Sequence, residues 1–406
     1  MFGEIKEEEY RKYWGKSPYK TFLSSTEIGV LREKEGWKKY FLGLKKNNEL
    51  KAATMIVARK SHFGKYDFYA PRGFLLDYND KDLIKEFTDD VKKFVKEHKG
   101  YEFRIDPYVV NVERDTNAKI VDGGKDNRWL ESYLEKLGYK KISKEETEQV
   151  IWMYALDTKD KSEDDMMKNM KPNTRNTIRK ALKNGIEIDE LRKEDLGEFF
   201  KIMEETGKRK GFNVRNLKYY ENMYDLYKPK DQIKFLIARL SLKDYIKGLE
   251  KSKKEAEEKK NALGPAKYND GKRKSFDNEI ASIEKRINSA KELKKKHGDI
   301  INLSGSMFIL TKPEVIYLSS GNYDEFMNFN AQYLIQWEMI KYAVNNKYDR
   351  YNFYGISGNF DKNDKDYGIY EFKTGFNGYV EELIGEYAYP TSFVYYIMKL
   401  IHKIRK

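Results

Sequence analysis

The sequence contains no cysteine, which excludes a disulfide framework, a thiolate nucleophile and any cysteine-ligated zinc or iron–sulfur site. Its four histidines are scattered and lack the spacing of metal ligands: His62, His98, His297 and His402. No G-x-S-x-G elbow supports a Ser-His-Asp triad, although the residue types alone do not exclude one. The glycine-rich loops that hold nucleotide phosphates are also missing.

Long apolar runs are lacking as well. No stretch approaches the roughly 18 apolar residues that a membrane-spanning helix needs. The stretch MFGEIKEEEYRKYW at the amino terminus is charged and has no apolar centre, so it does not resemble a signal peptide. The sequence therefore predicts a cytoplasmic protein.

Basic and aromatic residues are abundant instead. Among 406 residues, 79 are Lys or Arg and 66 are Asp or Glu, which gives a net charge of +13. Hydrophobic residues make up 39% and aromatic residues 15%, enough for the cores of two domains. The positive charge favours a polyanionic partner, such as a nucleic acid, a phosphorylated substrate or an anionic membrane surface.

Two parts of the chain repeat the order strand–strand–helix–strand with almost no shared residues. The elements expected in the first part are a hairpin at 38–59, a strand pair within FYAPRGFLLDY, a helix at 81–98 and a strand at 101–110. Those expected in the second part are a strand at 232–240, a hairpin at 301–322, a helix at 330–346 and a strand at 350–358. The repeat predicts an α/β (α+β) protein whose domains span 1–150, and 151–240 with 298–390.

Residues 241–297 interrupt the second part and are dense in Lys and Glu. Apolar residues recur there with heptad spacing, at Leu242, Tyr245, Leu249, Ala256 and Leu263, and then at Phe276, Ile280, Ile283, Ile287 and Ala290. Gly264 and Pro265 break the pattern near its middle. A solvated linker would not keep this spacing, so we expect an antiparallel coiled-coil arm of two helices, each of about 24 residues.

A basic stripe is expected on a helix within NMKPNTRNTIRKALKNGIEI. Its cations recur every four residues and share one helix face: Lys171, Arg175, Arg179 and Lys183. Thr174, Ile178 and Leu182 form the neighbouring apolar face. Like charges at this spacing repel one another, so the stripe is either a phosphate-binding surface or an ordinary solvated face.

The stretch around FKTGF alternates as a β-strand does. Tyr370, Phe372 and Phe376 share one side of that expected strand, and Lys373 lies on the other. The pattern leaves Lys373 either solvated or directed into a cleft.

Other candidates lie near the ends of expected elements. Asp106 ends an apolar strand before Pro107, where a turn-forming role and a carboxylate at a cleft edge both fit. Arg215 and Tyr219 are four residues apart, a pair suited to a phosphate or carboxylate. The basic, amphipathic tail at 391–406 fits either a helix packed on the first domain or one resting on a membrane surface.

Several segments together resemble the Fem family of peptidyltransferases over residues from about 18 to 390: YAPRGFLLDY, FRIDPYV, NMKPNTRNTIRKALKNGIEI, QWEMIKYA, RYNFYGISG and EFKTGFNGYVEELIGE, with the helical insertion. Fem enzymes use aminoacyl-tRNA to build the interpeptide bridges of bacterial peptidoglycan. The resemblance implies two domains similar to GCN5-type acetyltransferases and an aminoacyltransferase activity in cell-wall synthesis. It also implies a lipid-linked or nucleotide-linked muropeptide acceptor.

The resemblance assigns roles to individual residues. The active-site Phe-Lys pair of the family falls on Phe372 and Lys373, and Lys373 would stabilise the transition state of acyl transfer. The Asp of the family's Arg-x-Asp-Pro strand matches Asp106, which would position the attacking amine or act as its base. The implied substrate contacts are Arg32, Tyr101, Asn213, Arg215 and Tyr219. Three positions depart from the pattern of a relative that uses a nucleotide-linked acceptor: Arg32 replaces Lys, Asn213 replaces Thr and Ser319 replaces Tyr.

An aminoacyl-tRNA is an activated ester, so the implied reaction needs no cofactor, no metal and no covalent enzyme intermediate. The basic stripe would hold the tRNA acceptor end and the arm would contact the tRNA body, whereas DNA is not an expected partner. One alternative is a tRNA- or acyl-CoA-dependent N-acyltransferase that acts on a protein or small amine, although no R-x-x-G-x-[GA] loop supports CoA. A non-enzymatic coiled-coil adaptor is the other alternative.

Overall fold

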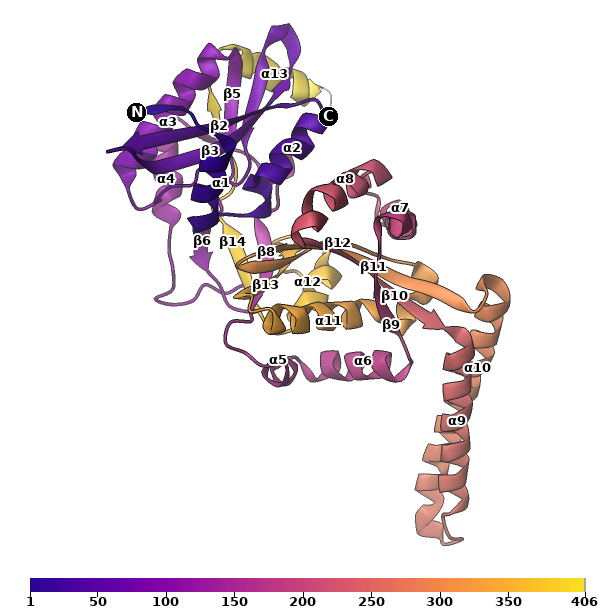
Figure 1. The fold of residues 1–406 in the computed structure, drawn as a ribbon. Helices are drawn as coiled ribbons and strands as arrows, with labels where there is room; N and C mark the ends of the chain where they lie inside the picture. The colour runs from indigo at the N-terminus through magenta and orange to yellow at the C-terminus, as the bar shows by residue number, and fades with distance from the viewer. Residues whose placement is uncertain (405–406) are drawn as a thin grey trace.

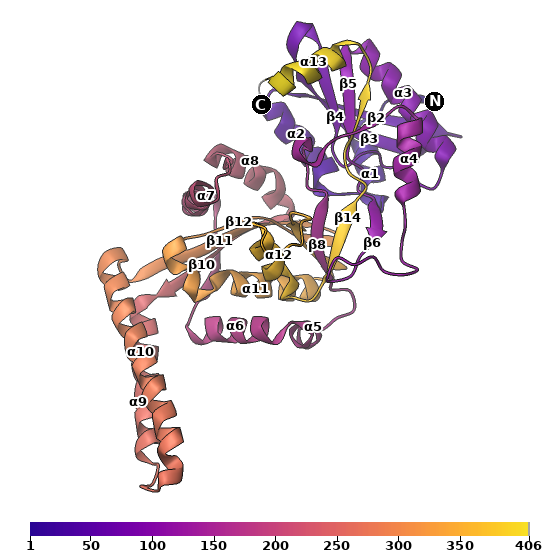
Figure 2. The same cartoon turned by 180° about the vertical axis from the view of Figure 1, so that it is seen from behind.

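The computed structural model describes residues 1–404 and contains two β-sheets flanked by helices, with a long helical arm leaving the second sheet (Figure 1). This arrangement confirms the mixed α/β class expected from the sequence. Figure 2 shows that the arm points away from the first sheet, so that the two lie at opposite ends of the molecule.

The first sheet has seven strands in the order β1-β2-β3-β4-β5-β15-β7. In that order the strands are Phe2–Glu4, Lys38–Lys46, Glu49–Lys60, Tyr66–Ala70, Gly100–Ile105, Tyr387–Pro390 and Lys140–Lys141. The hairpin β2–β3 lies where it was expected and turns at Asn47 and Asn48, which both have positive φ. The strand pair expected within FYAPRGFLLDY is reduced to β4 and one isolated bridge, between Leu75 and Ala53.

Helices cover both faces of the first sheet. On one face lie α3 (Lys81–Glu97) and α4 (Arg128–Lys136). On the other lie α1 (Glu7–Lys16) and α2 (Thr26–Lys34). Buried apolar residues of α3 recur at helical spacing, and the Asp80 side chain caps its start by accepting from the Leu83 amide.

The second sheet has eight strands in the order β6-β14-β8-β13-β12-β11-β10-β9. In that order they are Val110–Glu113, Tyr379–Leu383, Trp152–Asp157, Arg350–Gly355, Glu314–Asn322, Ile300–Thr311, Ile233–Ser241 and Glu187–Glu190. The strand expected at 101–110 is split, because β5 pairs in the first sheet and β6 in the second. β15 returns from the second part to the first sheet, so the two sheets exchange strands across the expected domain division.

Helices cover both faces of the second sheet too. One face carries α5 (Glu163–Asn169), α6 (Pro172–Lys183), α11 (Ala331–Asn345) and α12 (Tyr367–Thr374). The other carries α7 (Leu196–Lys210) and α8 (Leu217–Tyr227). One hydrophobic cluster runs through α1, α2, α7 and α8, so both domains bury apolar surface in a shared layer of helices.

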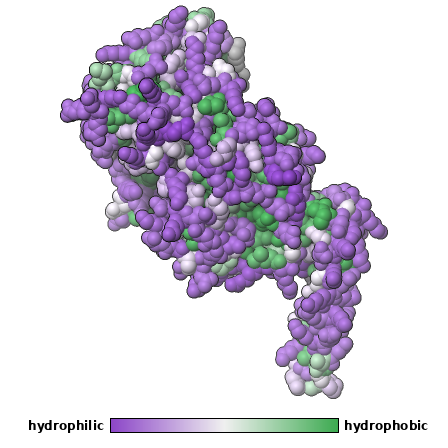
Figure 3. All heavy atoms as spheres, viewed as in Figure 1, coloured by the Kyte–Doolittle hydropathy of each residue, from purple (hydrophilic) through white to green (hydrophobic). Residues whose placement is uncertain are grey.

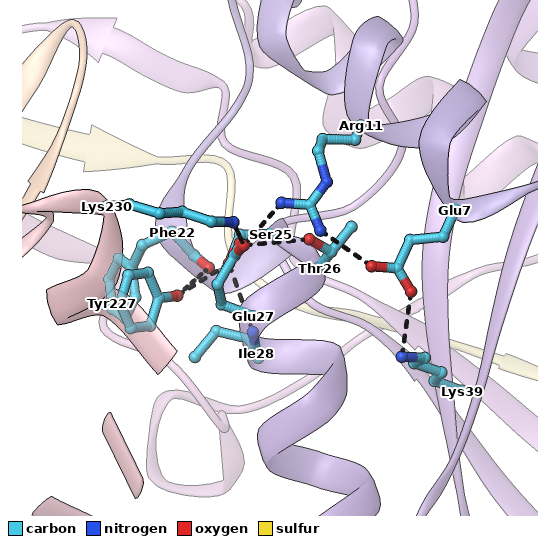
Figure 4. A network of polar contacts seen from close by, with 10 residues as sticks. All are labelled: Glu7, Arg11, Phe22, Ser25, Thr26, Glu27, Ile28, Lys39, Tyr227 and Lys230. Carbon is cyan, nitrogen blue, oxygen red and sulfur yellow. Dashed lines mark hydrogen bonds and ion pairs between the residues drawn. The ribbon is translucent and has the colours of Figure 1, made fainter. Parts of the chain in front are cut away.

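A polar network also joins α2 to the end of α8 (Figure 4). Glu27 of α2 accepts hydrogen bonds from Arg11 at 2.9 Å and from Lys230, which follows α8. Burial acts to raise the pKa of Glu27, but Lys230 and Arg11 hold it below its ordinary value. Ser25 and Tyr227 share a buried hydrogen bond of 2.8 Å. These bonds fix α2 against α8, and each of the two helices contributes candidate substrate-binding residues.

The arm consists of α9 (Leu242–Asn261) and α10 (Asp270–His297), as the heptad spacing predicted. The helices bury a seam that includes Leu249, Ala256, Ile283 and Ile287. The face of the arm that is seen in Figure 3 is mostly hydrophilic. The expected seam positions Leu263, Phe276 and Ile280 are only partly buried, because they lie near the tip.

The C-terminal helix α13 (Val394–Ile404) packs on the first sheet beside β5. Residues 405–406 of the expected tail helix lie outside the described residues. Within residues 1–404, no helix is both long and apolar enough to cross a membrane.

Candidate active site

Lys373 lies on helix α12, so the strand predicted through FKTGF is wrong. The stretch is too short to separate the two periods, because Phe372 and Phe376 are four residues apart and also fit one face of a helix. In the structure Tyr370, Lys373 and Thr374 are buried, at the spacing of one helix face. Lys373 therefore faces the second sheet together with apolar side chains instead of alternating with them.

The ammonium group of Lys373 is buried, since only 4% of the residue is exposed. Its Nζ donates to the carbonyl oxygens of Gly355 at 2.6 Å and Tyr354 at 3.3 Å, where β13 ends. Burial lowers the pKa of Lys373 to about 7, whereas the two carbonyl acceptors favour the charged form. An ammonium has three donors, so this arrangement leaves one N–H for a ligand.

Two cavities in the described part of the chain lie on the first domain. One, of about 490 Å³, is lined by residues that include Tyr13, Tyr19 and Leu76, and the other, of about 410 Å³, includes Tyr101. Lys373 lines neither of these two cavities, and the cleft expected around it stays a prediction.

Phe372 anchors α12. Its ring packs edge-on against Tyr333 of α11, with centroids 4.7 Å apart, and also against Phe376. The ring thus packs on α11 while the neighbouring Lys373 points to β13. The role in catalysis that the family resemblance implies for Phe372 stays a prediction.

The start of α6 is bonded to the end of α12. The Lys171 amide donates to the Gly375 carbonyl at 2.9 Å, and its Nζ donates to the Thr374 hydroxyl at 3.1 Å. Gly375 is needed for this close approach, because a Cβ there would lie 2.3 Å from the Thr174 hydroxyl. The basic stripe therefore begins beside the residue that follows Lys373.

Not every cation of the basic stripe is available to bind a ligand. Arg179 and Lys183 are exposed, but Arg175 donates to the carbonyls of Lys168 and Met170 and so also braces the turn before α6. The prediction that Leu182 belongs to the buried apolar face is wrong, because this residue is 49% exposed. Its place in the core is taken by another residue, Ala181, because the helix is rotated slightly from the expected phase.

Asp106 forms a buried pair with Arg72. Its Oδ1 accepts from the Arg72 amide at 2.6 Å, and its Oδ2 lies 3.3 Å from the Arg72 guanidinium. Burial raises the pKa of Asp106 to about 6, and Arg72 acts in the opposite direction. Arg72 also donates to the Val150 carbonyl in the segment that leads into the second sheet. The pair holds the junction between the two domains.

Tyr354 connects these groups and was not singled out in the sequence. Its carbonyl accepts from Lys373 and its hydroxyl donates to Gln149. Burial raises the pKa of Tyr354, and nearby Arg72 opposes that effect. Tyr354 has a positive φ of 61°, and β13 is irregular between Asn352 and Gly355. A strand pattern alone could not reveal this turned-out carbonyl.

The expected phosphate-binding residues come from α2, which carries Arg32, and from α8 together with the loop before it. Arg215 stacks on the Tyr219 ring of α8 at 5.2 Å. Burial raises the pKa of Tyr219, and the charges of Arg215 and of Arg32, from α2, oppose it. Arg32 is held by Glu35 at 2.8 Å. Asn213 is exposed on the loop before α8.

Tyr101 does not join this group. Tyr101 is on β5, five residues before Asp106, and five residues of extended strand span about 16 Å. There it is buried against Tyr395 and Met398 of α13. Tyr101 also lines the cavity of about 410 Å³, and its expected contact with the substrate stays a prediction.

Comparison with known proteins places this arrangement in a family. The family model described as "FemAB family" matches residues 5–403. The chain is 30% identical to Aminoacyltransferase FemA of Staphylococcus aureus strain RF122 / ET3-1, covering 96% of this chain and 95% of the relative, and equally to FemA of strain N315. The crystal structure of FemX has a TM-score of 0.74, with 25% identity, over 96% of this chain and 97% of FemX. The chain is therefore an aminoacyltransferase that belongs to the FemAB family.

Proposed function

We propose that the protein transfers an amino acid from aminoacyl-tRNA to an amine of a peptidoglycan precursor, on the stem peptide or a growing bridge. Membership of the FemAB family supports this reaction. The observation in this structure that supports it is the pair of hydrogen bonds between the start of α6 and the end of α12. Through these bonds the basic stripe begins beside the buried ammonium of Lys373. A polyanion bound along the stripe would bring its acylated end towards Lys373.

In the proposed reaction, the third N–H of Lys373 meets the carbonyl oxygen of the aminoacyl ester. The acceptor amine attacks the carbonyl carbon, a C–N bond forms, and negative charge gathers on that oxygen. Collapse breaks the C–O bond to the ribose, whose oxygen receives the proton that the amine releases. A fixed donor at such an oxyanion is worth about 3–4 kcal/mol, or roughly 10²- to 10³-fold in rate.

Asp106 acts as a positioning residue in this proposal. Its carboxylate is occupied by Arg72, and a base with a pKa of about 6 is poorly matched to an amine whose pKa is about 10.4. Arg32, Arg215 and Tyr219 would hold the diphosphate that links the acceptor to its carrier, since guanidinium groups suit phosphate oxygens. A lipid carrier would keep the reaction at the cytoplasmic face of the membrane.

The test is to incubate the purified protein with a panel of aminoacylated tRNAs and with lipid-linked or nucleotide-linked precursor. The masses of the products are then measured by mass spectrometry. We expect the acceptor to gain the mass of one or more amino-acid residues with at least one charged tRNA. Lys373→Met is the matched control and should yield far less product. No gain in mass with any donor and acceptor pair would overturn the proposal.

A further inference from the structure

Helix α13 has a buried face and an exposed apolar face. Tyr395 and Met398 pack into the first domain against Tyr101, Ile142 and Ala388. Other apolar side chains here are exposed: Phe393, directly before α13, is 75% exposed, and on α13 Tyr396 is 49%, Ile397 37% and Leu400 60% exposed. These four exposed apolar residues, three on α13 and one directly before it, form a patch that packing on the first domain does not explain.

Cations surround this patch. Lys140 lies 4.5 Å above the Tyr396 ring and donates to its hydroxyl, and Lys399 is exposed on α13 itself. The cavity of about 410 Å³ next to α13 is lined by Arg59 and Lys60 as well as Met398. The loop after Lys60 presents one more apolar side chain, Phe63, at 69% exposure. Exposed apolar groups with basic neighbours fit the interface of an anionic bilayer.

A row of cations leads from this surface to the proposed diphosphate site. Arg59, beside the cavity, lies over the Trp37 ring at 4.9 Å, and Arg32 lies over the same ring at 5.1 Å. Arg32 in turn acts electrostatically on Tyr219, on which Arg215 stacks. Arg59 is also paired with Asp67 at 2.9 Å, and Arg32 with Glu35 at 2.8 Å, so the basic groups alternate with carboxylates. Through Trp37, these two arginines connect the α13 surface with the phosphate-binding residues.

We propose that the end of the first domain that carries α13 and the loop at 61–65 rests on an anionic lipid surface. The part that concerns the acceptor rests on the proposed function: a lipid-linked diphosphate would enter past Arg59 and reach Arg32 without leaving the membrane surface. In this orientation the arm points away from the membrane (Figures 1 and 2), where a tRNA can reach it.

Vesicle co-sedimentation tests the membrane contact without any catalytic step. The probes are vesicles of pure phosphatidylcholine and of an equimolar mixture with phosphatidylglycerol. The protein should bind the mixed vesicles, and Phe393→Ser with Leu400→Ser should lower its partition coefficient at least about tenfold, because two exposed apolar groups no longer enter the interface. The matched control, Leu182→Ser with Met327→Ser, changes two exposed apolar residues of the second domain and should bind as the wild type does.

Equal vesicle binding by the α13 variant and the wild type, or no binding by either, would overturn the proposal. A second experiment distinguishes a membrane-binding role of this surface from a tRNA-binding role. The α13 variant should lose transfer to lipid-linked precursor in vesicles but retain it on nucleotide-linked precursor, with unchanged affinity for aminoacyl-tRNA. Loss of tRNA affinity instead would assign the surface to tRNA. If no transfer is detected with any acceptor, the proposed function fails while the vesicle result still stands.

Discussion

Replacing Lys373 by Met should stabilise the protein in mildly acidic solution. Burial lowers the pKa of Lys373 from 10.5 to about 7. Since one pKa unit corresponds to about 1.4 kcal/mol, burying the charged side chain in the folded protein costs up to about 5 kcal/mol of folding stability below pH 7. Met avoids this cost but leaves the carbonyls of Tyr354 and Gly355 without the donor, which costs about 2 kcal/mol. The net gain at pH 6 is about 3 kcal/mol.

The sign of the pH dependence follows from the direction of the shift. The unfolded chain holds the Lys373 proton up to a higher pH than the folded chain, so between pH 7 and 10.5 the wild type gains stability relative to the variant. Urea unfolding followed by circular dichroism at pH 6 and pH 10 measures this difference, with exposed Lys362→Met as the control. We expect the advantage of Lys373→Met to vanish near pH 9 and the wild type to be more stable by about 1 kcal/mol at pH 10. A variant that is less stable at pH 6, or a pH-independent difference, would refute the reasoning.

Three further predictions concern the junction and the two anion-binding surfaces. Asp106→Asn leaves Arg72 without its buried partner and should lower the free energy of unfolding by about 3–5 kcal/mol, and a loss below 1 kcal/mol in urea unfolding would contradict the paired geometry. Arg179→Glu with Lys183→Glu should weaken tRNA binding and reduce its salt slope by about 1 to 2, and unchanged binding in a filter assay would make α6 a solvated face. Arg215→Ala should raise the KM for the diphosphate-linked acceptor about tenfold with kcat retained, and an unchanged KM would remove it from that site.

Local patterns were sufficient for the elements that carry long periodic signals. The β2–β3 hairpin, the helices α3 and α11, and the arm follow from alternation, helical spacing and heptads. The strand exchange through β6 and β15 could not be seen, because pairing partners more than 250 residues apart leave no local trace.

The candidate site was foreseen in part. Lys373 was found through a family motif, but its element was mistaken, because eight residues are too few to separate a strand from a helix by periodicity. Arg72 and Tyr354 were missed, since their roles depend on a positive φ and on a charge pair formed by the fold. Tyr101 lies at the start of β5, whereas Asp106 follows the end of that strand, and the substrate contact expected for Tyr101 stays a prediction.

The rate of a single turnover measures the proposed role of Lys373 most directly. Enzyme saturated with aminoacyl-tRNA is mixed with saturating precursor, and the acyl-transfer step is followed by quenched flow for the wild type and Lys373→Met. We predict a fall of about 10²- to 10³-fold in that rate, with both substrates bound as tightly as before. A variant that transfers the amino acid within threefold of the wild-type rate would contradict a catalytic ammonium at α12.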